Sequence, residues 1–237
     1  MGGPGGWDAH AAAYEATVAQ REQGGVETDP DRILPAMLDL LGDITGHRVL
    51  DAGCGTGYLA RVLTDRGARV TGIDIGPNLI TRARARDHQG TIDYRVADLS
   101  RPLPSTDTQA FDAVASYLVL NDVENHKGFI STLATVLRPG GRMVILLNNP
   151  YIAVLHGHVT DYFDSGAASP YHGFAAAGIH VTFHHRTLAE YLDAFIGAGL
   201  ILRKLVDLAG VPMHSPYSLL PAGVRFPRFM LLAFDKP

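Results

Sequence analysis

The sequence contains a single cysteine, Cys54, so the chain cannot form an internal disulfide. This agrees with a reducing compartment. No stretch approaches the roughly 18 apolar residues of a membrane span, and the first residues lack the basic and apolar regions of a signal peptide. We therefore expect a cytoplasmic protein with no membrane partner.

Positive charge is also scarce. The net charge is −4, the pI is near 6.2, and we find no cluster of lysine or arginine on an expected strand or helix face. A nucleic-acid partner is therefore not expected, and a small molecule is the favoured substrate. At 237 residues with 46% hydrophobic content, the chain can form one α/β domain with additions around a large core.

The most informative segment is a glycine-rich turn between an apolar run and a helical pattern. Residues 49–57 read Val-Leu-Asp-Ala-Gly-Cys-Gly-Thr-Gly, and residues 58–63 resume apolar positions at helical spacing. Glycine is required where the backbone approaches a ligand closely or adopts a positive φ, and the first turn of the helix offers unpaired N–H groups. We therefore expect a strand, a ligand-binding turn and a helix.

The spacing of the glycines indicates which ligand. A dinucleotide fingerprint has glycines at its first, third and sixth positions, whereas here they stand at Gly53, Gly55 and Gly57, and the sixth position is Tyr58. Asp51, just before the glycines, would repel a pyrophosphate but could pair with an ammonium group or hold a water beside it. A cationic ligand of amino-acid type fits this turn better than NAD.

Residues 51–57 resemble the first motif of class I S-adenosylmethionine (SAM) dependent methyltransferases, of the small-molecule and natural-product type similar to the ubiquinone-biosynthesis methyltransferases. The resemblance covers roughly residues 45–147. It implies SAM as cofactor, S-adenosylhomocysteine as product, and an α/β fold. That fold is a doubly wound, Rossmann-like sheet of seven strands, six parallel and the last antiparallel, with an N-terminal helical lid and an insertion after strand 5.

Two more acids follow apolar strands. Asp74 lies 23 residues after Asp51, close to the offset of about 20 at which a Rossmann acid meets a ribose. The resemblance assigns Asp74 to the SAM ribose, Ile75 to packing on adenine, and Asp98 to an adenine contact with Leu99 supplying a backbone N–H. An aspartate at a strand end can instead cap a helix or form a turn, but three at successive strand ends favour a binding site.

The pattern continues through a fourth strand at residues 111–118, whose end lies beside the methyl group in the family. Residues 137–142, Leu-Arg-Pro-Gly-Gly-Arg, resemble the turn before a fifth strand at residues 143–147. The cofactor-binding residues that the resemblance implies are Tyr14, Asp51, Gly53, Cys54, Gly55, Gly57, Asp74, Ile75, Asp98, Leu99, Ser116 and Tyr117. Cys54 could also serve as a nucleophile, although we interpret it as a small residue that fits the turn.

We expect four segments: a helical lid at residues 1–44, a SAM-binding core at 45–147, a substrate-binding insertion at 148–186, and a last helix with the final strands at 187–237. Helical spacing of apolar residues predicts helices over residues 7–20 and 33–41. The first resembles a methyltransferase lid with Tyr14 as a SAM contact, and an ordinary packing helix is the alternative.

Residues 148–186 are polar, aromatic and too long for a plain connection. We expect Asn149, His156 and Tyr171 to bind the acceptor. His156, His158, Asp161 and Asp164 supply metal-binding atom types, but no rigid helix face or knuckle holds them at a known spacing. We therefore expect no metal.

Because SAM already carries an excellent leaving group, the protein mainly has to align the acceptor. A proton acceptor is needed only if the acceptor atom starts protonated, and His10 and His185 are the candidates for this role. Asn121 and Asn149 follow the fourth and fifth strands, at the sheet edge where such folds bind ligands, and could orient the acceptor. For each of these residues a surface or capping role is the alternative.

We predict a SAM-dependent methyltransferase that modifies O, N or C of a small, fairly apolar molecule, with aromatic secondary metabolites among the expected acceptors. A SAM-binding protein that does not transfer methyl, and a nicotinamide oxidoreductase, are the alternatives. The oligomeric state stays open, with a homodimer among the expected assemblies.

Overall fold

The computed structural model describes residues 6–22, 30–155, 157, 159–166, 168–171, 178–179, 181–209 and 226–237. Within these ranges the α-helices are α1 (Ala11–Glu22), α2 (Pro30–Leu41), α3 (Tyr58–Asp65), α4 (Pro77–Arg86), α5 (His126–Val136), α6 (Ile152–Leu155) and α7 (Leu188–Gly197). Short 3₁₀ helices are η1 (Trp7–His10), η2 (Ser105–Asp107) and η3 (Leu120–Asp122). The strands are β1 (Arg48–Ala52), β2 (Arg69–Asp74), β3 (Asp93–Val96), β4 (Phe111–Tyr117), β5 (Leu137–Asn148), β6 (Ala168–Tyr171), β7 (Val181–His184), β8 (Ile201–Ala209) and β9 (Pro227–Asp235).

Seven strands form one sheet in the order β3-β2-β1-β4-β5-β9-β8. The pairs among β1 to β5 are parallel, whereas β9 runs antiparallel to both of its neighbours, β5 and β8. This confirms the predicted sheet with an antiparallel last strand. Strand order reverses between β1 and β4, and the crevice at such a switch point is where open α/β sheets bind ligands.

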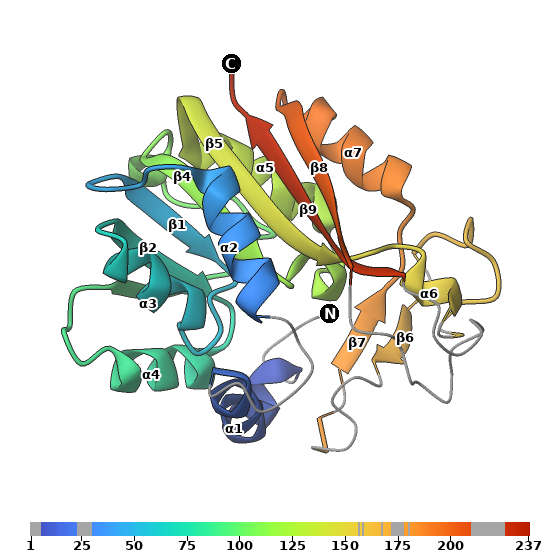
Figure 1. Ribbon diagram of the computed structural model, residues 1–237, viewed down its shortest axis with the longest axis horizontal. Coiled ribbons are helices and arrows are strands. Elements are labelled where there is room, and N and C mark those ends of the chain that lie inside the picture. Colours follow the sequence, from blue (N-terminus) through green and yellow to red (C-terminus); the bar gives the residue numbers. More distant parts are fainter. Residues whose placement is uncertain are drawn as a thin grey trace.

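Helices cover both faces of the sheet, and the core is correspondingly split into two layers (Figure 1). One layer packs α2, α3 and α4 against the sheet through buried residues such as Met37, Leu63 and Ile80. The other packs α5 and α7 through residues such as Ile130 and Phe195. The central strands are therefore buried on both faces, which explains their nearly continuous apolar sequences.

One boundary differs from the prediction. The expected turn at residues 137–142 is part of β5, which starts at Leu137 directly after α5 ends at Val136. The ladder with β4 shifts register between Phe111 and Ala113, and Gly140 has a φ of 71°. The Pro-Gly-Gly sequence thus produces an irregularity in the strand, because a glycine with positive φ lets the chain bulge and continue pairing.

The two segments that flank the core in sequence lie at one edge of the sheet. In Figure 1, α1 and the two-stranded β6–β7 ribbon lie below the carboxyl ends of β1 and β4. Trp7, Ala13 and Tyr14 pack against Ile179 and Val181. The N-terminal segment and residues 148–186 therefore meet each other over the edge where the glycine turn lies.

Candidate functional site

The glycine turn follows β1 as predicted. A Cβ on Gly53 would overlap the Val119 side chain, and one on Gly57 would overlap the Tyr94 hydroxyl and lie 3.0 Å from Tyr94 Cζ. Both glycines also have left-handed backbones, with φ of 77° and 79°. No other residue fits at these two positions without strain. The close packing of Val119, in the loop after β4, and of Tyr94, on β3, therefore explains why positions 53 and 57 are glycines.

Asp74, at the end of β2, holds this turn in place. Its Oδ2 accepts a hydrogen bond from Gly55 N at 2.9 Å, and its Oδ1 accepts one from Gly76 N at 2.8 Å. Burial raises the pKa of Asp74, and the two backbone N–H donors partly offset this. Because each carboxylate oxygen has two lone pairs, both can still accept hydrogen bonds from a ligand.

Asp51 is a buried carboxylate that forms no ion pair with the described residues, although the Arg61 guanidinium is near enough to oppose the rise in its pKa. Its side chain lies at the end of β1 with 1% exposure, and neither oxygen has a hydrogen-bond partner among the described residues. Burial, with a further contribution from nearby Asp74, raises the pKa of Asp51 to about 7. An ionised carboxylate in such a place is costly unless it is paired, so a cationic group bound at the turn would relieve a cost that the free protein bears.

Cys54 is buried between the turn and β2. Burial raises the pKa of its thiol, and the neighbouring Asp51 and Asp74 carboxylates raise it further. A nucleophilic cysteine needs the opposite shift, toward the thiolate. The structure therefore supports the interpretation of Cys54 as a small residue that fits the turn.

The residues expected to contact adenine lie in the loops after β2 and β3. Ile75 is 38% exposed, which is unusual for isoleucine and leaves its side chain available to a ligand, while Leu99 is buried. Asp98 Oδ1 accepts hydrogen bonds from Ser100 N at 2.9 Å and Ser100 Oγ at 2.6 Å. Asp98 thus also forms a turn, which was the alternative from the sequence, and its adenine contact stays a prediction.

At the end of β4, Ser116 is fully buried and its hydroxyl donates to Ala52 O at 2.8 Å, joining β4 to β1. The ring of Tyr117 meets that of Tyr58 edge-on. The next residue, Leu118, has a φ of 59°, a strained conformation for leucine. Strained conformations of this kind concentrate at functional sites. The left-handed backbone at Leu118 turns the chain so that Val119 packs against the glycine turn.

The N-terminal segment contacts all three loops that surround this edge. The Tyr14 ring lies over Gly55, where a Cβ would be 3.4 Å from Tyr14 Cε1. Asp8 Oδ1 accepts from Asn78 N at 2.7 Å and Leu79 N at 3.1 Å. Trp7 Nε1 donates to Asp122 Oδ2 at 2.8 Å. These contacts reach the loops after β1, β2 and β4 in turn, and the segment spans the candidate site.

Trp7, Asp8 and Asp122 were not found from the sequence. One signal was available for Asp8: α4 starts with Gly76-Pro77 and has no capping side chain of its own. Asp8 supplies that cap from 70 positions away, since it accepts from the first backbone N–H groups of the helix.

Asn121 and Asn149 both lie buried at the carboxyl ends of β4 and β5. Asn121 Nδ2 donates to Tyr191 Oη at 3.3 Å, and Asn121 Oδ1 accepts from Asn148 N at 3.0 Å. Asn149 Oδ1 accepts from Tyr151 N at 3.1 Å. Both amides therefore connect parts of the protein, and their role in orienting the acceptor stays a prediction.

The two predicted catalytic histidines lie on different segments. His10 is the last residue of η1 and is partly buried. His185 is 1% exposed, and its Nε2 donates to Tyr162 O at 2.8 Å because a carbonyl can only accept. His156 lies outside the described residues, and Tyr171 lies on β6 with its side chain outside them. Within the described part of the chain, no group of three or more metal-binding side chains is present.

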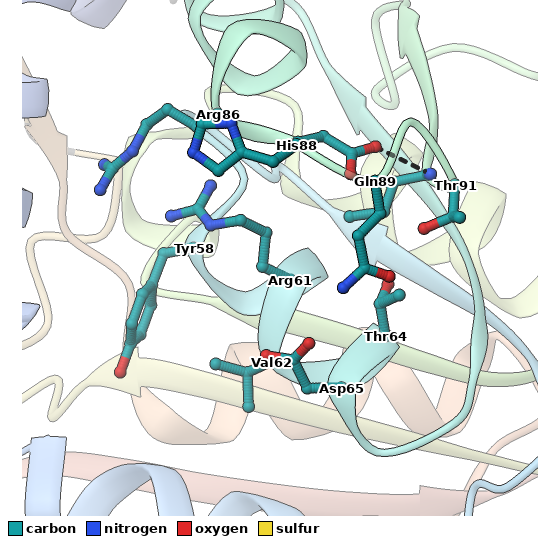
Figure 2. Close-up of a pocket in the computed structure, with 11 residues that line it drawn as sticks. Tyr58, Arg61, Val62, Thr64, Asp65, Arg86, His88, Gln89 and Thr91 are labelled. Carbon is teal, nitrogen blue, oxygen red and sulfur yellow. Dashed lines mark hydrogen bonds between the residues drawn. The ribbon is translucent and has the colours of Figure 1, made fainter.

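A separate groove of about 240 Å³ runs between α3, the end of α4 and residues 87–92 (Figure 2). Arg61, Arg86 and His88 are among the residues that line it. None of the residues predicted to bind the cofactor or the acceptor lines this groove. The candidate site is therefore distinct from this groove and lies at the loops that follow β1, β2 and β4.

Comparison with known proteins agrees with this geometry. Residues 50–145 match the family model described as a methyltransferase domain. A solved structure described as an S-adenosylmethionine dependent methyltransferase from Mesorhizobium loti superposes with a TM-score of 0.69 at 26% identity, covering 85% of this chain and 96% of that one. The chain contains a class I methyltransferase domain. SAM is the cofactor of that family.

Two curated relatives match a little under half of this chain. The demethylmenaquinone methyltransferase of Tropheryma whipplei is 40% identical over 111 residues, which are 46% of this chain and 45% of that protein. The ubiquinone biosynthesis O-methyltransferase of Xanthomonas oryzae pv. oryzae is 36% identical over 116 residues, 47% and 48% of the two chains. The chain thus spans a little under half the length of these relatives.

The residues of the methyltransferase domain fit SAM. Neither oxygen of the buried Asp51 carboxylate has a hydrogen-bond partner among the described residues, which leaves both open to an ammonium group, and Asp74 retains acceptor capacity for hydroxyl groups. Gly53 and Gly57 let the turn pack closely against Val119 and Tyr94. Among the described residues, no helix has both the length and the apolar character needed to cross a membrane.

Proposed function

We propose that this protein transfers the methyl group of SAM to a small aromatic acceptor of quinone or hydroxylated-ring type. The observation on which this depends is the buried Asp51 carboxylate, whose oxygens have no hydrogen-bond partner among the described residues, at a turn that Asp74 holds in place. A cationic amino-acid nucleoside matches that charge, whereas a dinucleotide would bring a pyrophosphate next to it. This also argues against the nicotinamide alternative.

Two observations support an aromatic methyl acceptor. The two relatives are named as a demethylmenaquinone methyltransferase and a ubiquinone biosynthesis O-methyltransferase. In addition, residues 148–186 offer aromatic rings near the same edge: Tyr151 and Tyr162 stack with centroids 4.9 Å apart, and Phe163 is 80% exposed. Aromatic faces of this kind favour planar rings. We therefore infer that residues 148–186 bind the acceptor and that residues 1–44 cover the site as a lid.

Isothermal titration calorimetry tests whether the protein binds SAM. SAM and S-adenosylhomocysteine should bind in the micromolar range. Asp74→Ala should weaken SAM binding about 100-fold, because the variant loses charge-assisted hydrogen bonds to the ligand and to Gly55 and Gly76. Asp93→Ala on β3 is the control, since that aspartate is exposed and pairs only with Arg95 among the described residues. Unchanged SAM binding by Asp74→Ala would show that the ribose assignment is wrong.

Mass spectrometry tests the transfer. After incubation with SAM and hydroxylated benzoquinones or catechols, an acceptor should gain one methylene unit. A protein that binds SAM but methylates none of these acceptors would instead support the alternative of SAM binding without methyl transfer.

A further inference from the structure

Asp122 is a carboxylate at the candidate site to which no sequence pattern drew attention. It is the last residue of η3, five positions beyond the end of β4. Its Oδ2 accepts a hydrogen bond from Trp7 Nε1 at 2.8 Å, across 115 positions of sequence. Its Oδ1 accepts no hydrogen bond from the described residues, so one oxygen of a positioned carboxylate is available to another partner.

The loop that carries Asp122 lies directly against the cofactor turn. Val119 is close enough to Gly53 that a Cβ there would overlap its side chain, and the left-handed Leu118 sets the direction of this loop. Asp122 follows Val119 by three residues, and its backbone N–H donates to Val119 O at 2.9 Å. Asp122 is therefore close to the end of β4, beside which the transferred methyl lies in the family.

The charged and titratable groups around Asp122 come from three elements. Asp74, at the end of β2, acts on it electrostatically, as does the Tyr191 hydroxyl of α7. Arg186 lies beside Tyr191, and His184 belongs to β7, which packs against η3. Burial raises the pKa of Asp122 to about 7, Asp74 adds to the increase, and the indole N–H of Trp7 opposes it.

We propose that Asp122 accepts the proton of a phenolic or enolic hydroxyl on the methyl acceptor, held in position by Trp7 of the lid. The inference rests on the proposed function. As the acceptor oxygen forms its bond to the methyl carbon, the C–S bond breaks and its electron pair stays on sulfur. The O–H bond breaks, its electron pair stays on the acceptor oxygen, and the proton passes to Asp122 Oδ1 and later to solvent.

Asp122 fits this role better than the two predicted histidines. The Nε2 proton of His185 is donated to Tyr162 O, and its Nδ1 is buried without a hydrogen-bond partner among the described residues. His10 lies on the same 3₁₀ turn as Trp7, whose indole N–H donates to Asp122 in the loop after β4. Asp122 combines a place beyond β4 with an oxygen that accepts no hydrogen bond from the described residues and can take the proton.

The test uses two matched variants of the full chain. Asp122→Asn keeps the shape and an oxygen that can accept from Trp7, but it cannot accept the proton of a hydroxyl group. Trp7→Phe removes the indole donor and leaves the carboxylate. For each variant we would measure kcat against pH with a catechol acceptor, SAM affinity by calorimetry and folding by circular dichroism.

Asp122→Asn should lower kcat about 100-fold, within the usual range for loss of a general base, and should bind SAM within about threefold of the original chain. The original chain should show kcat rising with pH through about 7, because the carboxylate must be ionised to act. This rise should disappear in Asp122→Asn. In Trp7→Phe the rise should persist but move to higher pH, because the indole N–H lowers the pKa of Asp122.

A second readout does not depend on turnover. Trp7 is the single tryptophan of the chain, so its fluorescence should report ionisation of the carboxylate that it contacts. Emission should change through about pH 7 in the original chain and not in Asp122→Asn.

The outcomes separate the two proposals. If the original chain methylates catechols and Asp122→Asn does so within about threefold of its rate and with the same pH profile, Asp122 is not the proton acceptor. A fluorescence transition that persists in Asp122→Asn contradicts the inference as well. If the original chain binds SAM but methylates no hydroxylated ring, the proposed function fails, and the inference fails with it.

Discussion

The two halves of the ligand-binding edge are built differently. The cofactor half, residues 48–99, uses contacts between neighbouring loops, such as Gly55 N to Asp74 Oδ2, 19 positions apart. The half that we propose for the acceptor comprises residues 111–126 and 148–191 with the N-terminal segment. It depends on contacts such as Asn121 to Tyr191 and Trp7 to Asp122, which are 70 and 115 positions apart. The first half follows a local pattern that a sequence displays, and the second depends on how distant segments pack.

Replacing Gly57 should give the largest effect on stability and would test how tightly the cofactor half is packed. Gly57→Ala should lower the free energy of unfolding by about 3 kcal/mol, since the new methyl group overlaps the Tyr94 hydroxyl and the residue keeps a left-handed backbone. Urea denaturation measures the loss.

Gly42→Ala is the matched control for this prediction. Gly42 has a φ of 75° but no atom within 4 Å of the added Cβ. Gly42→Ala should therefore lower the free energy of unfolding only by the backbone strain, about 1 kcal/mol. Tyr94→Phe in the Gly57→Ala background should recover part of the difference, because the Tyr94 hydroxyl is buried without a partner among the described residues. Equal losses for Gly57→Ala and Gly42→Ala would show that packing against Tyr94 contributes nothing.

Asp51 should make the free protein less stable as the pH rises. Its folded-state pKa of about 7 lies above the unfolded value of about 3.9, so the folded state binds more protons between them. Stability should therefore fall from about pH 4 to about pH 7 and then level off. Asp122 contributes to the same slope.

Asp51→Asn should remove about 3 kcal/mol of this decrease and should weaken SAM binding. Unfolding free energies at about pH 5 and about pH 8, with and without SAM, measure both effects. A pH dependence identical to that of the original chain would mean that Asp51 is not the group responsible.

Asp8 should give the smallest effect and tests how the N-terminal segment is attached. Asp8→Ala removes the cap of α4 and should cost about 1 kcal/mol, while Asp8→Asn keeps an accepting oxygen and should cost less. Trp7 fluorescence should shift toward that of an exposed indole in Asp8→Ala only. If Trp7 emission is unchanged, the segment is held mainly by its packing on Ile179 and Val181.

Much of the fold could be predicted because the relevant signals are local. Buried parallel strands read as apolar runs, and the sequence displays an aspartate near the end of β1, at the end of β2 and in the loop after β3. The start of β5 was wrong by six residues, since Pro139-Gly140-Gly141 signals a turn in sequence but forms an irregular strand beside β4 and the chain end at Lys236. Neighbouring strands override the local preference there.

The sequence by itself determined the sheet, the glycine turn and the acids Asp51, Asp74 and Asp98, because these depend on residues within a few positions of one another or on a fixed strand order. Only the tertiary structure decided that Asp8 caps α4, that Trp7 contacts Asp122, and that Asn121 joins β4, β5 and α7. Those contacts join side chains whose separation in sequence carries no periodic signal. Their partners are set by which segments the packed sheet brings together.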